Sequence, residues 1–287
     1  MINKRIINLK SDIYAKYVSV YSNLSVAAKA VILYFHGGGL LYGHRDDLPQ
    51  YHLQEFCNAG YIIAAFDYPL APAAKIPEII NDVEASIRIY SEQPFTISFA
   101  PLPYFLWGRS AGAYLCLLAA SHSFATPPLG IISYYGYGFL TDYWYNQPSP
   151  YYCRFPTVSE KSIEDCSRVI TAAGELDTCY SRYVYARQKG KWIGQFYDDR
   201  EKYFYQNYSL RSAQDFSLSQ AVFLAHSTND TDVPYEEFLA LCDFLKHSEK
   251  YIVSEAVHDF DRNTDTRSAK ELLAKTIRFL DNALKLY

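Results

Sequence analysis

Residues 104–120 read YFLWGRSAGAYLCLLAA. The apolar run at Tyr104–Trp107 is typical of a buried strand, and the run of small and apolar residues at Ala113–Ala120 favours a helix. Between them lies a Gly-x-Ser-x-Gly pattern with Ser110 at its centre, which indicates a sharp strand-to-helix turn. Such a turn strains the serine backbone, so very small residues are needed two positions before and after it. The stretch therefore predicts a strand, a turn that projects the Ser110 hydroxyl, and a helix.

Outward from this turn, short runs of β-branched and aromatic residues alternate with helical patterns. The runs that predict buried strands lie at 31–35, 61–66, 104–107, 131–135, 221–225 and 251–253. Helices are expected at about 47–59, 76–92, 111–122, 235–247 and 267–285. Residues 1–20 favour antiparallel edge strands. This alternation predicts an α/β fold, with a mostly parallel central sheet of about eight strands flanked by helices.

One segment departs from this alternation. Between about Leu140 and Ser212, roughly seventy residues separate two predicted strands, whereas a strand–helix–strand unit needs about thirty. Helical patterns lie near 158–173 and 179–190, and half of the 28 tyrosines fall between positions 131 and 210. We expect one α/β domain over residues 1–287, with a helical cap insertion at about 140–212 folded over the carboxyl edge of the sheet. The alternative is a helical excursion that has no role at the site.

The composition argues against several classes of function. The 287 residues are 49% apolar and carry a net charge of −4 from 27 basic and 31 acidic residues, which are spread without blocks. No basic stripe is present to bind nucleic acid, and no run approaches the ~20 apolar residues of a membrane span. The N-terminus lacks the apolar stretch of a signal peptide, and the six scattered cysteines form no Cys-x-x-Cys pair. We therefore expect a cytoplasmic protein with reduced cysteines, and without metal, cofactor, nucleic-acid partner or inserted membrane segment.

A glycine-rich loop follows the run at 31–35. Residues 36–39 read HGGG, and the carboxyl ends of parallel strands meet at one edge of a sheet, so this loop is expected beside the serine turn. Glycines leave backbone N–H groups free to face a ligand. Acyl transfer needs two or more such donors where a carbonyl oxygen becomes negative. We predict an oxyanion hole formed by the N–H groups of Gly37, Gly38 and Ala111, and a plain glycine turn is the alternative.

Two further segments at predicted strand ends supply an acid and a base. Residues 226–234 read HSTNDTDVP, and by chemistry alone either Asp230 or Asp232 can orient a histidine. Residues 255–260 read EAVHDF after the last predicted strand. Of the seven histidines, His258 is the candidate base, because the others lie in the glycine loop, in the acid turn, or in loops and helices without a strand-end context. A serine hydroxyl becomes a good nucleophile when a neutral imidazole, held by a carboxylate, accepts its proton.

The order of Ser110, the acid turn and His258 resembles the α/β-hydrolase superfamily over essentially the whole chain. Residues 36–39 and the stretch DYPLAP at 67–72 are similar to the esterase/lipase branch related to hormone-sensitive lipase. The acid turn, Asp-x-x-Val-Pro, resembles that of small acyl esterases, thioesterases and prolyl-oligopeptidase catalytic domains. This last resemblance implies that Asp230 is the triad acid, with Asp232 as the alternative.

Three positions depart from the esterase/lipase branch. Arg109 precedes Ser110, where the branch usually has an acidic residue. Pro69 and Ala73 replace the usual arginine and glutamate of the second motif. These departures leave the three candidate catalytic residues in place and leave the substrate class open.

The resemblance implies a metal-free serine hydrolase that works through an acyl-enzyme, and a serine carboxylesterase is the leading hypothesis. Ser110 attacks an acyl carbonyl, His258 takes its proton and returns it to the leaving group, and Asp230 orients His258. The tyrosine-rich insertion favours a small-molecule ester with a partly aromatic, amphipathic acyl or alcohol group. An amidase or peptidase on the same triad, and a hydrolase-fold protein that has become a binding module, are the alternatives.

Overall fold

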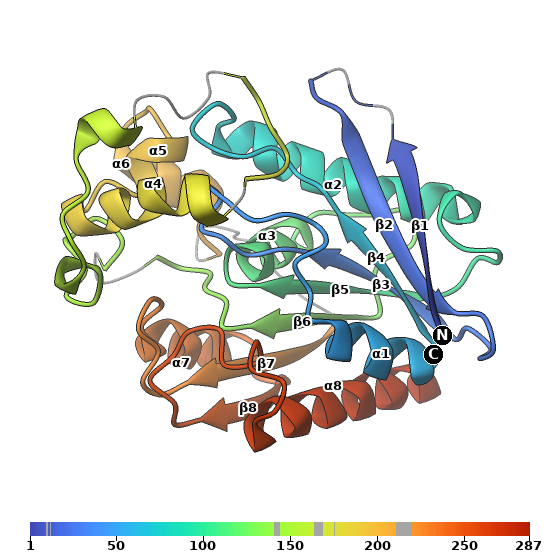
Figure 1. Cartoon of the computed structure of the whole chain (residues 1–287). Helices are drawn as coiled ribbons and strands as arrows, with labels where there is room; N and C mark the ends of the chain where they lie inside the picture. Colours follow the sequence, from blue (N-terminus) through green and yellow to red (C-terminus); the bar gives the residue numbers. More distant parts are fainter. Residues whose placement is uncertain (10, 12, 141–143, 164–168, 175, 211–219) are drawn as a thin grey trace.

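The computed structural model describes residues 1–287 except 10, 12, 141–143, 164–168, 175 and 211–219. The described residues form one sheet of eight strands, which are β1 (Ile2–Leu9), β2 (Lys16–Asn23), β3 (Ala30–Phe35), β4 (Tyr61–Phe66), β5 (Tyr104–Arg109), β6 (Gly130–Tyr134), β7 (Ala221–Ser227) and β8 (Glu249–Val253). Their order in the sheet is β1-β2-β4-β3-β5-β6-β7-β8, and β3 to β8 are parallel (Figure 1). The predicted α/β fold with a mostly parallel sheet is confirmed.

The two N-terminal strands differ from the rest. β1 pairs antiparallel with β2, and β2 pairs antiparallel with β4. β1 lies at the edge of the sheet, and its exposed and half-buried residues alternate as expected for a strand with one face toward solvent. The predicted antiparallel edge strands are therefore confirmed.

Helices cover both faces of the sheet. They are α1 (Gln50–Asn58), α2 (Ile76–Glu92), α3 (Ala111–Ala119), α7 (Tyr235–Phe244) and α8 (Arg267–Leu286). α1 and α8 pack on one face, and α2, α3 and α7 pack on the other (Figure 1). Because helices lie on both sides, every residue of β3, β4 and β5 is buried, which accounts for their continuous apolar runs.

The C-terminal helix α8 shows how the sequence pattern selects a buried face. Leu272, Leu273, Thr276 and Leu280 recur at helical spacing and are buried against the sheet. Each fully buried leucine contributes about 2 kcal/mol to folding. The hydroxyl of Thr266 caps the helix by accepting a hydrogen bond from the backbone N–H of Ala269 at 3.2 Å.

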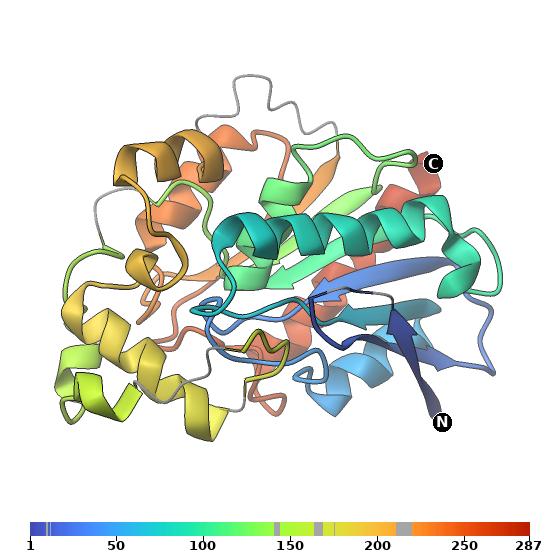
Figure 2. The ribbon, with the colours of Figure 1, turned by 90° about the horizontal axis from the view of Figure 1, so that it is seen from above.

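The segment between β6 and β7, residues 135–220, is called the β6–β7 segment. Its helical turns are η2 (Tyr152–Arg154) and η3 (Glu160–Ile163), and its helices are α4 (Leu176–Lys189), α5 (Ile193–Phe196) and α6 (Glu201–Tyr208). Figures 1 and 2 both show α4, α5 and α6 together at the end of the molecule opposite the chain termini. Part of the predicted insertion at 140–212 lies outside the described residues, namely 141–143, 164–168, 175, 211 and 212.

The two helices expected in this segment have different outcomes. The helix expected at 179–190 corresponds to α4. The helix expected near 158–173 is wrong: a short 3-10 turn occupies Glu160–Ile163, residues 169–174 are irregular, and 164–168 lie outside the described residues. The reason is tertiary, because the backbone around Thr171 and Gly174 pairs with the loops that follow β4 and β3 instead of with itself. Within the described residues, no helix is both long and apolar enough to cross a membrane.

Candidate active site

Ser110 occupies the turn between β5 and α3. Its backbone has φ 51° and ψ −118°, a strained conformation for a residue with a side chain. A Cβ on Gly112 would lie 2.1 Å from the carbonyl oxygen of Phe35 at the end of β3. A Cβ on Gly108 would lie 2.2 Å from the backbone nitrogen of Ala113. Both glycines are therefore needed for the chain to turn this sharply beneath Ser110.

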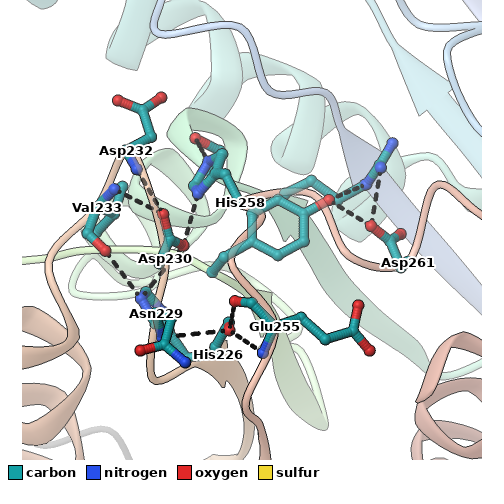
Figure 3. Close-up of polar contacts among 12 residues, drawn as sticks. His226, Asn229, Asp230, Asp232, Val233, Glu255, His258 and Asp261 are labelled. Atoms are coloured by element: carbon teal, nitrogen blue, oxygen red, sulfur yellow. Dashed lines mark hydrogen bonds and ion pairs between the residues drawn. The ribbon is translucent and has the colours of Figure 1, made fainter. Parts of the chain in front are cut away.

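The loops after β7 and β8 bring an acid and a base to this serine. Nε2 of His258 lies 2.9 Å from Oγ of Ser110, and Nδ1 of His258 lies 2.7 Å from Oδ2 of Asp230. Figure 3 shows the imidazole of His258 beside the Asp230 carboxylate. When Nδ1 donates its hydrogen to the carboxylate, Nε2 is left to accept the proton of the Ser110 hydroxyl. The structure thus brings together the three residues that the sequence singled out.

Asp230 is held as a buried carboxylate. Its Oδ1 accepts hydrogen bonds from the backbone N–H groups of Asp232 at 2.8 Å and Val233 at 2.9 Å. Its Oδ2 also lies 3.4 Å from Nε2 of His226. Burial alone raises the pKa of Asp230, but His258, His226 and the backbone donors outweigh it and hold that pKa below its ordinary value. Asp230 is therefore ionised at any pH at which His258 could accept a proton.

His258 has an environment that favours a proton. Burial alone lowers the pKa of His258, but the carboxylate of Asp230, followed by those of Asp232 and Asp259, raises it to about 9. The cause is an excess of negative charge around a ring that is mostly shielded from water. An imidazolium that forms when the ring takes a proton is therefore stabilised in place.

Asp232, the other candidate acid, does not contact His258. Its Oδ1 and Oδ2 accept hydrogen bonds from the hydroxyl of Tyr183 at 2.8 and 2.7 Å, and Oδ1 lies 2.9 Å from a guanidinium nitrogen of Arg187. Figure 3 shows the Asp232 carboxylate directed away from His258. The geometry therefore favours Asp230 over Asp232 as the partner of the imidazole.

The two loops that carry the acid and the base are tied to each other. The hydroxyl of Ser227, at the end of β7, donates to the carbonyl oxygen of Glu255 and accepts from the Glu255 N–H at 3.0 Å (Figure 3). The backbone N–H of Thr228 donates to the carbonyl oxygen of Val253 at 2.9 Å. The spacing between Asp230 and His258 is thus fixed by short links at the ends of adjacent strands.

The glycine loop lies directly against the serine turn. A Cβ on Gly37 would lie 3.4 Å from Cβ of Ser110, and Gly38 has φ +101°. Among the described residues, no backbone acceptor pairs with the N–H groups of Gly37, Gly38 or Ala111. Unpaired N–H groups beside a nucleophile are available to an oxygen that becomes negative. The structure therefore places Gly37, the residue before Gly38, against the turn that carries Ser110 and Ala111.

His36 and Tyr68 support this loop from the sheet side. The Tyr68 hydroxyl donates to the carbonyl oxygens of His36 at 2.9 Å and Gly37 at 3.2 Å. The rings of His36 and Tyr68 stack with centroids 4.1 Å apart. Burial lowers the pKa of His36 to about 4, so its ring is neutral at ordinary pH. Tyr68 comes from the stretch at 67–72 that resembles the second esterase/lipase motif, and its contact explains what that stretch does here.

A cluster of buried charges lies beneath the His258 loop. Arg109 donates from Nε to the hydroxyl of Tyr135 at 2.6 Å and from a terminal nitrogen to Oδ1 of Asp261 at 3.0 Å. Its other terminal nitrogen lies 3.5 Å from Oδ2 of Asp47. Burial alone would raise the pKa of Asp261, but Arg109 and His52 hold it well below its ordinary value. The arginine that departs from the esterase/lipase branch is thus the centre of a buried ion network.

This network reaches the candidate base through Tyr135. The ring of Tyr135 packs edge-on against His258 with centroids 4.7 Å apart, and its hydroxyl also donates to Oδ1 of Asp261 at 2.7 Å. His52, from α1, lies 3.0 Å from Oδ2 of Asp261 through Nε2. His258 and Asp261 belong to the same loop, so the network fixes that loop from below.

Sequence reasoning missed the partners of Arg109. An arginine within a buried strand needs a carboxylate, but the chain offers many acids and no periodic signal indicates which one. The nearest clue is that Asp261 follows His258 by three residues. His52 lies in a predicted helix, away from the strand ends, and no motif connects it with the site.

Among the described residues, no group of three or more His, Cys, Asp or Glu side chains is arranged to hold a metal ion. No disulfide bond joins any two of the five cysteines in the described part of the chain, and Cys166 lies outside it.

Comparisons with known proteins agree with this architecture. The BD-FAE family model matches residues 18–245 of the chain. A structure from Staphylococcus aureus, described as a protein with unknown function, superposes with a TM-score of 0.83 at 27% identity, over 99% of each chain. An α/β hydrolase superfamily protein from Enterococcus faecalis superposes with a TM-score of 0.82 at 24% identity, over 98% of this chain and 99% of that one.

Curated relatives match over shorter stretches. Lipase 2 of a Moraxella species is 32% identical over 97 residues, which are 32% of this chain and 21% of the lipase. An acetyl esterase of Salmonella schwarzengrund is 29% identical over 93 residues, which are 32% of this chain and 29% of the esterase. The chain thus spans less than a third of the length of the curated relatives it matches.

Proposed function

The chain belongs to the BD-FAE family, and we propose that it is a serine carboxylesterase that works through an acyl-enzyme intermediate. The observation that carries this proposal is the unbroken line of contacts from Asp230 through His258 to Ser110 at 2.7 and 2.9 Å. The names of the Moraxella lipase and the Salmonella acetyl esterase support ester hydrolysis as the reaction.

In the first half of the reaction, Ser110 Oγ attacks the acyl carbonyl carbon while His258 Nε2 takes the hydroxyl proton. The carbonyl oxygen becomes negative and is stabilised by the N–H groups of Gly37, Gly38 and Ala111. Losing one such donor typically costs about 3 kcal/mol of transition-state stabilisation. The protonated His258 then gives its proton to the leaving alkoxide, and the acyl-enzyme remains.

In the second half, water replaces the departed alcohol. His258 takes a proton from the water as the oxygen attacks the acyl-enzyme, and the second tetrahedral intermediate uses the same N–H donors. The proton returns to Ser110 Oγ as the acid leaves, so the enzyme ends as it began. Asp230 stays ionised throughout and keeps Nδ1 protonated.

We also propose that the β6–β7 segment acts as a cap over this site. Its support is a set of aromatic contacts: the ring of Tyr180 lies 5.5 Å from that of Tyr42, centroid to centroid, and Tyr42 follows the glycine loop. Both rings are half-buried. Tyrosine offers apolar area with a polar tip, so we expect a small-molecule ester with an amphipathic acyl or alcohol group.

The test compares the wild type with Ser110→Ala on p-nitrophenyl acetate and butyrate, and measures labelling with a fluorophosphonate probe. We expect Ser110→Ala to lose both hydrolysis and labelling. The control is Ser121→Ala, an exposed serine two residues beyond the end of α3, and this substitution should leave both unchanged. Full activity in folded Ser110→Ala protein would refute the proposal.

A further inference from the structure

The glycine loop has few backbone hydrogen bonds of its own. The carbonyl of Gly38 accepts from the N–H groups of Leu41 at 3.0 Å and Tyr42 at 3.1 Å, but no backbone donor among the described residues reaches the carbonyl of Gly39. Gly38, Gly39 and Leu40 follow one another with φ of 101°, 58° and 66°. Three left-handed residues in a row form no regular structure, and glycine has the largest conformational freedom of all residues. The N–H groups of an oxyanion hole need a fixed direction. The contacts that fix Gly39 must therefore come from elsewhere in the chain.

The first of these contacts comes from the β6–β7 segment. The indole N–H of Trp192 donates to the carbonyl oxygen of Gly39 at 2.9 Å, and Trp192 is 1% exposed. A Cβ on Gly39 would lie 2.3 Å from Cε2 of Tyr183, so the Tyr183 ring of α4 closes over the glycine. Gly39 is thus held by one hydrogen bond and one aromatic face from a segment more than a hundred residues away.

Backbone pairs from the same segment hold the chain after the loop. The N–H of Gly43 donates to the carbonyl of Gly174 at 2.8 Å, and the N–H of Gly174 donates back at 3.0 Å. The N–H of Leu70 donates to the carbonyl of Thr171 at 2.8 Å. The loop is therefore enclosed between the sheet and the β6–β7 segment.

Helix α4, which carries Tyr183, also reaches the turn that contains Asp230 and Asp232. The Tyr183 hydroxyl and the Arg187 guanidinium both bind the carboxylate of Asp232, two residues after Asp230. A terminal nitrogen of Arg187 also donates to the carbonyl oxygen of Asp232 at 3.1 Å. Tyr183 thus touches the glycine loop with its ring and the acid turn with its hydroxyl.

We propose that Trp192 and Tyr183 are positioning residues for the oxyanion hole, so that the β6–β7 segment is part of the catalytic apparatus as well as a cap. The inference rests on the proposed serine-hydrolase function. Without the Trp192 hydrogen bond, the Gly39–Leu40 peptide unit is free to rotate. Glycine backbone offers little resistance to such a rotation, so the N–H of Gly38, earlier in the same loop, loses part of its fixed direction. The oxyanion exists in the transition state and not in the bound substrate. We therefore expect the substitution to reduce stabilisation of the transition state, which lowers kcat, and to leave substrate binding unchanged.

The test is Trp192→Phe, with Trp144→Phe as the matched control. The two indoles stack with centroids 5.9 Å apart in one aromatic cluster, but Trp144 donates its N–H to Glu237 at 3.3 Å and not to the glycine loop. We expect Trp192→Phe to lower kcat on p-nitrophenyl butyrate about tenfold, with KM within about twofold of wild type. Trp144→Phe should keep kcat within about twofold.

A trifluoromethyl ketone, which forms a tetrahedral adduct with the serine, provides a second readout. Its affinity should fall in Trp192→Phe by the same factor as kcat, because both report the oxyanion. If Trp192→Phe does not fold, benzothienylalanine at position 192 keeps the shape of indole and removes the N–H donor alone, and we expect the same fall in kcat.

Two outcomes overturn this inference. One is a kcat in Trp192→Phe equal to that of Trp144→Phe at equal folded fraction, and the other is a change confined to KM. The proposed function is tested by a different variant. It would be refuted if folded Ser110→Ala protein kept its activity. An inactive Ser110→Ala together with an unchanged kcat in Trp192→Phe refutes the positioning role alone.

Discussion

The loop that carries His258 rests on buried charges of the central α/β core, whereas the glycine loop beside Ser110 rests on neutral contacts. Beneath His258, Arg109 pairs with Asp261 at 3.0 Å, and the side chains of both are almost wholly buried. Around Gly39, the contacts are one indole N–H and one tyrosine ring from the β6–β7 segment. The same reaction centre is therefore held by two kinds of force on its two sides.

This difference predicts how each side responds to substitution. A buried charge left without its partner costs about 3–5 kcal/mol, because the remaining ion has no water to solvate it. A lost neutral hydrogen bond costs about 1 kcal/mol. We therefore expect loss of the charges beneath His258 to act through stability, and loss of the contacts around Gly39 to act through kcat with the fold intact.

The largest effect is expected from the acid turn. Asp230→Asn should lower kcat roughly 10⁴-fold, because an amide cannot hold the imidazole tautomer that leaves Nε2 free. Asp232→Asn, two residues away, keeps Asp230 in contact with His258 and should lower kcat far less, while weakening the Arg187 ion pair. Steady-state kinetics on p-nitrophenyl butyrate separates the two. Equal losses in kcat would contradict the assignment of Asp230 as the triad acid.

The next effect concerns the charges beneath His258. Arg109→Met should lower the free energy of unfolding by about 3–5 kcal/mol, because it leaves the wholly buried Asp261 without its arginine partner. The double variant Arg109→Met/Asp261→Asn should recover part of this loss, because the isolated charge is gone. Urea unfolding measures the free energy of unfolding of the single and the double variant.

The matched control for this prediction is Arg262→Met. Arg262 also faces Asp47, at 3.8 Å, but its side chain is 54% exposed. Its loss should cost about 1 kcal/mol or less. If Arg109→Met and Arg262→Met destabilise the protein equally, the buried network does not support the His258 loop.

The sequence predicted the sheet and the serine turn because their signals are local. Apolar runs at β3, β4 and β5 reflect burial on both faces, and the turn at Ser110 follows from the two glycines that flank it. The glycine loop is recognisable in the same way, because three consecutive glycines directly after a strand favour a turn with accessible N–H groups. These features need only a few neighbouring residues to be recognised.

The contacts that hold the site could not be predicted in the same way. Trp192 meets Gly39 across 153 positions of sequence, and Arg109 meets Asp261 across 152. Each pair is a single contact without a repeating pattern, so the sequence does not indicate which residue is the partner of Trp192 or of Arg109. The helix expected near 158–173 failed for a related reason, because long-range backbone pairs at Thr171 and Gly174 replaced local ones.

A smaller effect is expected from pH, and it has opposite signs for activity and stability. The pKa of His258 is raised to about 9, and the ring must be neutral to accept the Ser110 proton. The value of kcat/KM should therefore rise about tenfold per pH unit below 9 and level off above it. The folded-state pKa lies above the ordinary value of 6.5. The stabilisation from the His258–Asp230 pair is therefore fully present below about 6.5 and is lost as pH rises through 9.

The variant Asp259→Asn sharpens this prediction. Asp259 is one of the carboxylates that raise the pKa of His258, and its own side-chain partner within the described part of the chain is Arg262, not Ser110. Its removal should move the midpoint of the kcat/KM profile to lower pH and leave the plateau unchanged. A midpoint that does not move, or that moves to higher pH, would contradict an excess of negative charge around His258.

The smallest effect is expected where the glycine loop meets the sheet. Tyr68→Phe removes a hydroxyl that donates to the carbonyls of His36 and Gly37, but Gly37 keeps a second contact, because Nδ1 of His36 lies 2.7 Å from its carbonyl oxygen. We expect a loss of about 1 kcal/mol in the free energy of unfolding and a fall in kcat of about twofold to threefold. Because Trp192 provides the only side-chain hydrogen bond to Gly39 among the described residues, Trp192→Phe should reduce kcat more than Tyr68→Phe. The reverse order would mean that the sheet, and not the β6–β7 segment, sets the direction of the oxyanion donors.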